Sequence, residues 1–341
     1  MRKGYTYFAE GDVLFAKITP CMQNGKHAVA TGLHGGFGFG STEFHVIRPG
    51  PSVTPEWVHH FVMQPWVLQD ATAHFTGAVG QQRVPENYLR ELQVPLPPLP
   101  EQRRIAVVLQ THLAAVGRAR AAAEAQLQAA RALPAAYLRA VFDGPEAQQW
   151  PRRRMGDVLR LRKEVVHPRD RPSGPATFVG LEHIESHTGR RIGSLPVEMS
   201  DLTGRKPVFY AGDIVYGYLR PYLNKVWIAE FDGLCSVDQY VYTVDTSTSD
   251  RRFVSWFMRS PVYLERAAAG AAPAWLPRIR IEEVGATEVN LPPLSEQRRM
   301  AAMIDDHMAT VDRLRQALEE QLDALDGLPA ALLQQAFSGM V

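Results

Sequence analysis

The hydrophobic and polar positions of the chain follow two regimes, and each regime occurs twice. Residues 1–95 and 145–290 alternate short apolar and aromatic runs with glycine, proline and aspartate, a pattern that predicts strands. The expected strands are DVLFAKI, STEFHVIRPG and ELQVPLP in the first region, and GDVLRLRKE, TFVGLEHIES, GDIVYGYLR, KVWIAEF and DQYVYTV in the second. Each region also holds helical spacing, in PEWVHHFVMQPWVLQDAT and DRRFVSWFMRSPVYLERAA. Pro55 and Pro65 predict two short helices or one kinked helix in the first of these stretches.

The other regime is a long helix, predicted over residues 101–142 and again over 296–337. Pro100 and Ser295 are favourable first or capping residues, and Pro134 predicts a kink or a further helical turn. Apolar residues of the second helix recur at steps of three and four, namely Val311, Leu314, Leu318, Leu325, Leu328 and Leu332. The equivalent residues of the first helix are Val116, Ala119, Ala123, Ala130, Leu133 and Tyr137. Large side chains opposite small ones favour packing of one helix on the other. Two separate surface helices are the alternative.

An internal duplication connects these regimes. LPPLPEQRR at 96–104 recurs as LPPLSEQRR at 291–299, and the 49-residue segments that begin with these motifs agree at 26 positions without a gap. The globular regions are also related, because Phe8–Pro20 aligns with Phe209–Pro221 and Arg83 aligns with Arg278. We therefore expect an α+β molecule with approximate two-fold symmetry. Its predicted parts are 1–95, 96–144, 145–290 and 291–341. Residues 150–201 have no counterpart ahead of Phe8, so we expect the first strand-rich domain to be incomplete.

Composition adds little to this picture. The net charge of +1 gives no global attraction to a polyanion, and 45% hydrophobic residues are ordinary for a globular protein. Two cysteines cannot form a disulfide framework, and no apolar run has the length of a membrane span. We expect a cytoplasmic protein without a membrane.

Sequence signatures of catalysis are missing. The glycine-rich run Gly35–Ser41 is followed by a predicted strand rather than a helix, so it predicts a hairpin turn and not a nucleotide loop. NLPPL at 290–294 only partly matches the Asn-Pro-Pro-aromatic loop of adenine methyltransferases, and no cofactor-binding strand, glycine loop and helix accompany it. We also find no nucleophile elbow, zinc-protease motif or Walker loop, and no metal ligand set. The chain is predicted to be non-catalytic.

Binding residues are predicted instead, in two loops of each strand-rich region. Arginine with asparagine or glutamine is the set that contacts guanine and adenine edges, and lysine and tyrosine commonly contact phosphates. The alternative for each loop is a polar hairpin without a ligand. The predicted DNA-binding residues are Lys17, Gln23, Asn24, Lys26, Gln81, Gln82, Arg83, Tyr218, Arg220, Tyr222, Asn224, Lys225, Arg278 and Arg280.

The duplicated motif, each copy opening a long helix after a strand-rich region, resembles the specificity subunit of Type I restriction–modification systems. GFGSTEFHVIRP at 38–49 and FVGLEHIESHTG at 178–189 are similar to further segments of that family. The resemblance covers essentially the whole chain. It implies two target-recognition domains, each recognising one half of a bipartite DNA site. It also implies two conserved helices that pair as an antiparallel coiled coil and set the spacer between the half-sites.

The resemblance further implies how the subunit works with others. It has no catalysis or cofactor of its own, and it binds double-stranded DNA together with two modification subunits. Those subunits use S-adenosylmethionine to methylate adenine, and restriction subunits join the complex. Two alternatives remain: an assembly scaffold that binds modification subunits but does not recognise DNA, and an autonomous methyltransferase, which the missing cofactor motifs disfavour.

Overall fold

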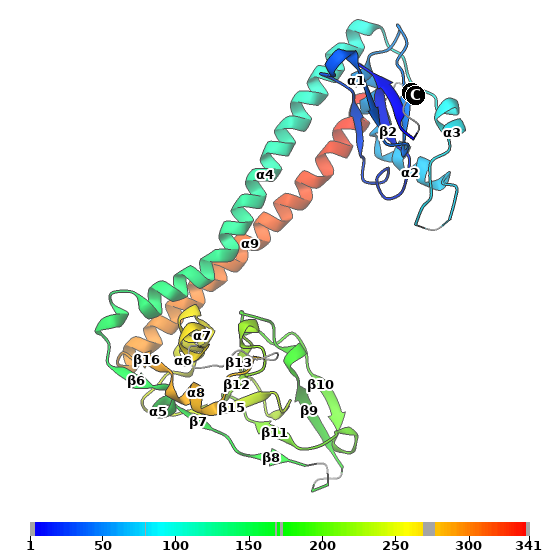
Figure 1. The fold of residues 1–341 in the computed structure, drawn as a ribbon. Helices are drawn as coiled ribbons and strands as arrows, with labels where there is room; N and C mark the ends of the chain where they lie inside the picture. The colour runs from blue at the N-terminus through cyan, green and yellow to red at the C-terminus, as the bar shows by residue number, and fades with distance from the viewer. Residues whose placement is uncertain (1–3, 79, 168, 171–172, 269–276, 339–341) are drawn as a thin grey trace. The chain divides into compact units, whose positions relative to one another are not determined.

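A computed structural model describes residues 4–78, 80–167, 169–170, 173–268 and 277–338. The chain forms two compact units (Figure 1). Unit 1 comprises Met1–Leu127 and Ala317–Val341, and unit 2 comprises Gln128–Gln316. Each unit therefore combines one strand-rich region with segments of both long helices. Among the described residues, no helix is long and apolar enough to cross a membrane.

Unit 1 contains two small antiparallel sheets covered by short helices. Strand β1 (Thr6–Ala9) pairs with β4 (Phe37–Gly40), and β2 (Val13–Ala16) lies between β3 (His27–Val29) and β5 (Phe44–Ile47). The helices are η1 (His34–Gly36), α1 (Pro55–Val62), α2 (Pro65–Ala73) and α3 (Glu86–Glu91). The side chain of Thr54 caps α1 by accepting from the Trp57 amide, and Pro65 begins α2, so the expected pair of short helices is confirmed.

Unit 2 has the same plan with more strands. One sheet has the order β13-β12-β15-β7, a second has the order β10-β9-β14-β11-β8, and β6 pairs with β16. The strands are β6 (Arg152–Arg154), β7 (Leu159–Leu161), β8 (Val165–Val166), β9 (Pro175–Val179), β10 (Leu195–Glu198), β11 (Lys206–Phe209), β12 (Ile214–Gly217), β13 (Val226–Ile228), β14 (Gly233–Cys235), β15 (Gln239–Val244) and β16 (Glu288–Asn290). The helices are η2 (Ala147–Gln149), α5 (Met155–Val158), η3 (Leu181–His183), η4 (Met199–Asp201), η5 (Pro221–Leu223), α6 (Arg251–Arg259), α7 (Pro261–Ala268) and α8 (Ile281–Ala286).

Two strand predictions and one turn prediction are corrected by the structure. ELQVPLP forms the end of α3 and an extended segment without a described strand partner, whereas its counterpart β16 is paired with β6. GDVLRLRKE is divided into the helical turn α5 and the strand β7. The glycine run is not only a turn, because Phe37–Gly40 is strand β4. Glycine is needed there because a Cβ on Gly38 would lie 2.7 Å from the Phe8 ring.

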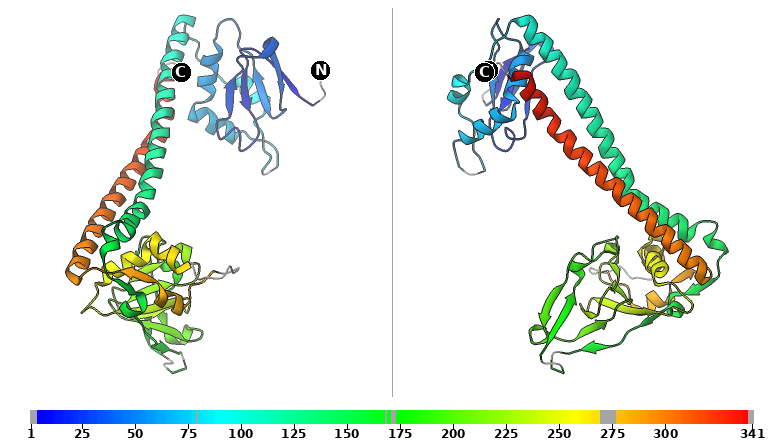
Figure 2. Two further views of the ribbon diagram at one scale, coloured as in Figure 1. Left: turned by 60° about the vertical axis from the view of Figure 1, so that its left-hand side comes forward. Right: turned by 180° about the vertical axis from the view of Figure 1, so that it is seen from behind.

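The two long helices are α4 (Leu99–Asp143) and α9 (Leu294–Phe337), which confirms both predicted spans. Pro134 and Pro329 lie inside these helices, so the residues that follow Pro134 are part of α4 and not a separate helix. The two helices run in opposite directions within each unit. In unit 2 their ends lie side by side (Figure 2), where the rings of Tyr137 and His307 stack at 3.8 Å. In unit 1 Arg120 Nε lies 2.7 Å from Asp326 Oδ1.

The buried stripe of these helices differs in part from the predicted one. Ala123, Ala130, Val311 and Leu318 are buried as expected. Leu133, Leu314 and Leu328 are each more than 40% exposed, and Leu127 and Leu138 are buried instead. The core of unit 1 takes Ile105, Leu109, Leu333 and Phe337 from the helices, and the core of unit 2 takes Leu138, Phe142, Met300, Ala301 and Ile304. Apolar residues of α4 and α9 are therefore buried against the globular core of each unit as well as between the two helices.

The duplicated motif places one fully buried glutamine at the start of each long helix. Gln102 Oε1 accepts the Thr54 amide at 2.9 Å, and its Nε2 donates to the carbonyls of Pro97 and Ser52. Gln297 Oε1 accepts the Asp250 amide at 2.8 Å, and its Nε2 donates to the carbonyls of Pro292 and Thr248. Each glutamine thus joins its helix to the segment that begins α1 or α6. We call this arrangement the glutamine clamp.

Candidate nucleic-acid interface

In each unit the structure brings together the two loops that the sequence separately predicted to carry DNA-binding residues. In unit 1, Ile18 forms an isolated antiparallel bridge with Arg83, and the Thr19 amide donates to the Gln82 carbonyl at 2.9 Å. In unit 2, Leu219 forms the same bridge with Arg278, and the Arg220 amide donates to the Pro277 carbonyl at 2.8 Å. The turn after β2 or β12 therefore lies beside the loop that precedes α3 or α8. The two copies have equivalent geometry.

In unit 2 these loops present three exposed arginines. Arg220, Arg278 and Arg280 are exposed, and none of their guanidinium groups forms a hydrogen bond or ion pair with a described residue. Arg220 has a left-handed backbone with φ of 53°, which begins the turn of η5. Tyr222 in that turn is 57% exposed. An exposed arginine without an internal partner keeps all its donors for a ligand.

Two stacked tyrosines lie beside these arginines. The rings of Tyr218 and Tyr240 are 4.2 Å apart and nearly parallel, and the Tyr218 hydroxyl donates to the Val237 carbonyl. Burial raises the pKa of Tyr240 to about 12 and also raises the pKa of Tyr218, while Arg278 acts on both in the opposite direction. Both phenols therefore stay neutral near pH 7. We call Tyr218, Arg220, Tyr222, Tyr240, Arg278 and Arg280 the arginine–tyrosine surface.

Tyr240 was not among the predicted residues, and two predicted residues have internal roles. The signal that could have found Tyr240 is the two-residue period of tyrosines in β15, which pairs with β12 and places Tyr240 opposite Tyr216. Asn224 is only 1% exposed, and its Nδ2 donates to the Arg259 carbonyl at 2.7 Å. Its predicted contact with DNA is therefore wrong, because the side chain is inside unit 2. Lys225 donates through Nζ to the Leu181 carbonyl at 2.6 Å, which occupies one of its three donors.

The equivalent loops of unit 1 are polar but carry a compensated arginine. Arg83 forms two hydrogen bonds with Glu43, at 2.8 and 2.9 Å, and donates to the Gln81 carbonyl. The hydrogen bond from Arg83 lowers the pKa of the Glu43 carboxyl, so the pair is ionised near neutral pH. The other predicted residues there are either exposed (Gln23, Asn24, Lys26, Gln81) or half-buried (Lys17, Gln82). Gln23 Oε1 also accepts from the Thr19 hydroxyl at 2.6 Å.

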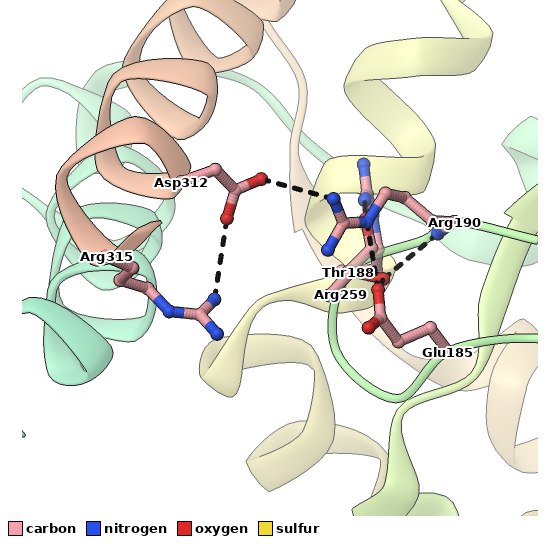
Figure 3. Close-up of polar contacts among 6 residues, drawn as sticks. All are labelled: Glu185, Thr188, Arg190, Arg259, Asp312 and Arg315. Carbon is pink, nitrogen blue, oxygen red and sulfur yellow. Dashed lines mark hydrogen bonds and ion pairs between the residues drawn. The ribbon is translucent and has the colours of Figure 1, made fainter. Parts of the chain in front are cut away.

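A cavity of about 820 Å³ in unit 2 lies between the loop 185–190, α6 and the two long helices. Figure 3 shows the polar contacts at its wall. Arg190 lies 2.9 Å from Glu185 and 3.8 Å from Asp312 of α9, and Arg315 contacts the other oxygen of Asp312. Arg259 donates to the Thr188 carbonyl and lies over the Trp256 ring, and burial lowers the pKa of its guanidinium to about 10. These contacts anchor the loop 185–190 to α6 and to α9.

Gly189 provides a test of this anchor. Its φ is +72°, and a Cβ there would overlap Nη1 of Arg259. Gly204 has a φ of +67° with no atom within 4 Å of its Cβ position, so it is a matched control. We expect Gly204→Ala to cost about 1 kcal/mol from the left-handed backbone alone. Gly189→Ala is expected to cost about 2 kcal/mol more, because Arg259 must also move. Urea unfolding of both variants measures the difference, and equal costs would contradict the anchoring role.

The described residues contain no group of three or more His, Cys, Asp or Glu side chains that could hold a metal ion.

Comparison with known proteins gives matches to one family. Residues 2–123 match the family described as the Type I restriction modification DNA specificity domain. The chain is 30% identical over 190 residues to the Type I restriction enzyme EcoDI specificity subunit of Escherichia coli, covering 56% of this chain and 42% of that protein. It is 42% identical over 108 residues to the EcoAI specificity subunit of the same organism, covering 31% of this chain and 18% of that protein. The chain thus spans less than half the length of these relatives.

Two solved structures share the fold. One, from work on complex assembly and conformational transition of the type I R-M system, has a TM-score of 0.76 at 22% identity and covers 100% of this chain and 85% of its own. The HsdS subunit from Thermoanaerobacter tengcongensis has a TM-score of 0.67 at 23% identity and covers 100% of this chain and 84% of its own. The class is therefore the two-domain fold with paired helices found in specificity subunits. The chain is similar to Type I restriction enzyme specificity subunits, and residues 2–123 match the DNA specificity domain model.

Proposed function

We propose that this chain recognises double-stranded DNA for a Type I restriction–modification complex and that the arginine–tyrosine surface of unit 2 makes the main contact. The observation that carries the proposal is the set of exposed arginines at two joined loops, whose guanidinium groups have no hydrogen bond or ion pair with any residue that the structure describes. Such guanidinium groups can bind guanine edges through two parallel hydrogen bonds or bind phosphates. The hydroxyl of the exposed Tyr222 supplies a further donor for the backbone of the duplex.

The two units are expected to contribute unequally. Glu43 compensates Arg83 in unit 1, and DNA must displace this carboxylate before the arginine can bind a phosphate or a base. Gln23, Asn24 and Lys26 remain exposed in unit 1 and supply weaker, uncompensated contacts. We infer that unit 2 supplies more of the binding free energy than unit 1.

The partners follow from the family. We propose that the chain docks modification subunits, that these subunits bind S-adenosylmethionine and methylate DNA, and that restriction subunits join the complex. The chain itself is proposed to bind no cofactor and to catalyse no reaction. The chain has a net charge of only +1. Partner subunits that contact phosphates would supply the positive charge that binding to DNA needs.

The proposal predicts a strong effect of two arginines on DNA binding. The chain, purified with its modification subunit, is incubated with a randomised duplex library, and bound duplexes are sequenced to obtain the preferred site. Arg220→Ala with Arg278→Ala is expected to weaken binding to that site by about 100-fold at fixed salt, because each arginine that binds a base edge contributes about 1 to 3 kcal/mol. The slope of log affinity against log salt should also become shallower if either arginine binds a phosphate.

The matched control is Arg153→Ala, an exposed arginine on β6 outside the arginine–tyrosine surface. It should leave the site preference and affinity unchanged. Unchanged affinity in the double variant would overturn the assignment of this surface. A complex that assembles but enriches no sequence from the library would overturn DNA recognition and favour a scaffold.

A further inference from the structure

The cavity of about 820 Å³ in unit 2 has a mainly apolar wall. Leu138 of α4, Trp256 of α6, Leu264 of α7 and Met308 of α9 contribute to this wall, and every lining residue belongs to unit 2. Figure 3 shows polar side chains that share the wall with them. A concave apolar space of this size with a few placed polar groups is typical of a site for a small molecule.

One polar side chain of the wall, Arg259, is a buried cation. The residue is 9% exposed, and its guanidinium carbon lies 3.4 Å from the centroid of the Trp256 ring. Nη1 donates to the Thr188 carbonyl, but Nε and Nη2 donate to no described residue, and no described carboxylate forms an ion pair with the group. Burial lowers its pKa only to about 10, so the guanidinium is charged near neutral pH. A counter-charge is what stabilises a buried charge, so an anion is the partner that suits Arg259.

The unpaired edge of Arg259 is the one that binds carboxylates elsewhere in this chain. In unit 2, Nε and Nη2 of Arg162 each donate to one oxygen of Asp213, at 2.8 and 3.0 Å. In unit 1, Nε and Nη2 of Arg48 bind Asp12 in the same way, at 2.8 and 2.7 Å. This edge presents two parallel N–H donors that match the two oxygens of a carboxylate. The chemical group that fits Arg259 is therefore a carboxylate.

The charges of the wall favour a ligand with one negative charge. The acidic and basic side chains that line the cavity have a net charge of +1, and they are Arg131, Arg190, Arg259, Arg315, Glu185, Asp305 and Asp312. One of the carboxylates is already engaged, since Asp305 lies 3.1 Å from Arg252 and accepts from Trp256 Nε1 at 2.7 Å. The acidic side chains would repel a dianion, such as a phosphate monoester, more strongly than a monoanion. A monocarboxylate balances the wall.

Asn224 adds a second unpaired polar atom to the wall. Its side chain is buried, Nδ2 donates to the Arg259 carbonyl, and Oδ1 has no hydrogen-bond partner among the described residues. A buried amide oxygen without a donor is unfavourable, so an N–H or O–H group of a ligand would be stabilised there. Asn224 and His187, which also lines the cavity, are two of the three described non-glycine residues with positive φ, at 47° and 68°. Such backbone conformations cluster at sites that bind ligands.

We propose that this cavity binds a small organic monocarboxylate whose apolar body carries one N–H or O–H donor. The carboxylate binds Nε and Nη2 of Arg259, the donor binds Asn224 Oδ1, and the apolar body packs on Leu138, Leu264 and Met308. The bound molecule contacts the loop 185–190, α6 and both long helices of unit 2 at once. The proposal is independent of DNA binding, because the cavity shares no residue with the arginine–tyrosine surface.

The test uses the full chain and two probes of the same shape, indole-3-acetate and indole-3-acetamide. The first carries a carboxylate, an indole N–H and an apolar ring, and the second has a neutral amide in place of the carboxylate. A ligand-observed NMR titration should show saturable binding of indole-3-acetate, with a dissociation constant on the order of 1 mM for a molecule of this size. Indole-3-acetamide should bind about tenfold more weakly or less tightly still, because a neutral amide does not compensate the buried guanidinium.

Two neighbouring alanines of α4 give a matched pair of variants. Ala135 is exposed and lines the cavity, whereas Ala136 is exposed and does not line it. Ala135→Trp should place a large side chain in the cavity and weaken the binding of indole-3-acetate by about tenfold or more. Ala136→Trp should leave that binding unchanged. Both positions are exposed, so both variants should fold, which circular dichroism checks. Arg259→Lys keeps the charge but lacks the two parallel donors, and it should weaken the binding to a similar extent.

Equal affinity for indole-3-acetate and indole-3-acetamide would overturn the proposal. So would saturable binding of indole-3-acetate that Ala135→Trp leaves unchanged, or a titration without saturable binding. Arg220→Ala with Arg278→Ala should weaken DNA binding and leave the binding of indole-3-acetate unchanged. Failure of this site is therefore distinguishable from failure of the proposed function.

Discussion

Replacing Gln297 by leucine is expected to destabilise unit 2 by about 3 to 5 kcal/mol. The side chain is fully buried, and its amide satisfies the Asp250 amide and the carbonyls of Pro292 and Thr248. Leucine has nearly the same volume but no polar atom, so three buried backbone groups lose a partner, at about 1 to 3 kcal/mol each before relaxation. Asp250 is also the N-cap of α6, so the start of that helix should loosen.

Urea unfolding gives the total cost, and hydrogen exchange shows where the structure loosens. Arg298→Leu is the matched control, because Arg298 is the next residue on the same helix and is exposed. It should change stability by less than about 0.5 kcal/mol. Gln102→Leu should repeat the effect in unit 1, with faster exchange at α1 and not at α6. A cost for Gln297→Leu no larger than that of Arg298→Leu would show that the clamp does not hold the helix to the unit.

Mild acid is expected to destabilise unit 1. Burial lowers the pKa of His27 and His60 from the ordinary value of 6.5 to about 4, with the neighbouring His59 as a smaller cause. Each imidazole is therefore neutral in the folded unit at a pH where the unfolded chain binds a proton. The contribution to stability is complete above about pH 6.5 and is lost as the pH falls towards 4. For His60, which is 7% exposed, the loss is on the order of 3 kcal/mol.

Denaturant unfolding at pH 7.5, 6.0 and 4.5 measures this loss. His60→Phe is the informative variant, because the counterpart of His60 in unit 2 is the aromatic residue Trp256. Phenylalanine does not titrate, so the variant should lose less stability between pH 7.5 and 4.5 than the parent. His74→Phe is the control, because His74 is exposed at the end of α2. Identical pH profiles for the parent and His60→Phe would contradict the assignment.

The internal repeat made much of the fold predictable. Both long helices and the pair of short helices α1 and α2 follow from periodicity and from turn residues, as do the strands β2, β5, β7, β9, β12, β13 and β15. The alignment of Arg83 with Arg278 also places two loops at equivalent positions, and the structure joins each of them to the turn that follows β2 or β12. These features depend on local patterns that survive in both copies, so one sequence was sufficient to find them.

The missed features depend on contacts between distant residues. Asn224 resembles an exposed recognition residue in a polar turn, but a left-handed backbone with φ of 47° turns its amide towards Arg259. Leu133 and Leu314 follow a helical stripe yet face solvent, because the globular cores compete for the apolar side of each helix. Arg83 and Arg278 share an alignment position but differ in charge compensation, since Glu43 reaches Arg83 while the shorter Asp238 forms no described ion pair with Arg278.

The glutamine clamp has a consequence for how such proteins change. Every partner of Gln102 and Gln297 is a backbone amide or carbonyl, so no side chain of the strand-rich region is needed to receive the helix. A strand-rich region can therefore be replaced by one of unrelated surface sequence. The condition is that its backbone follows the same path beside the start of the long helix. The duplicated motif occurs as LPPLPEQRR at 96–104 and as LPPLSEQRR at 291–299. Recombination within this motif would exchange whole strand-rich regions while keeping every hydrogen bond of the glutamine clamp.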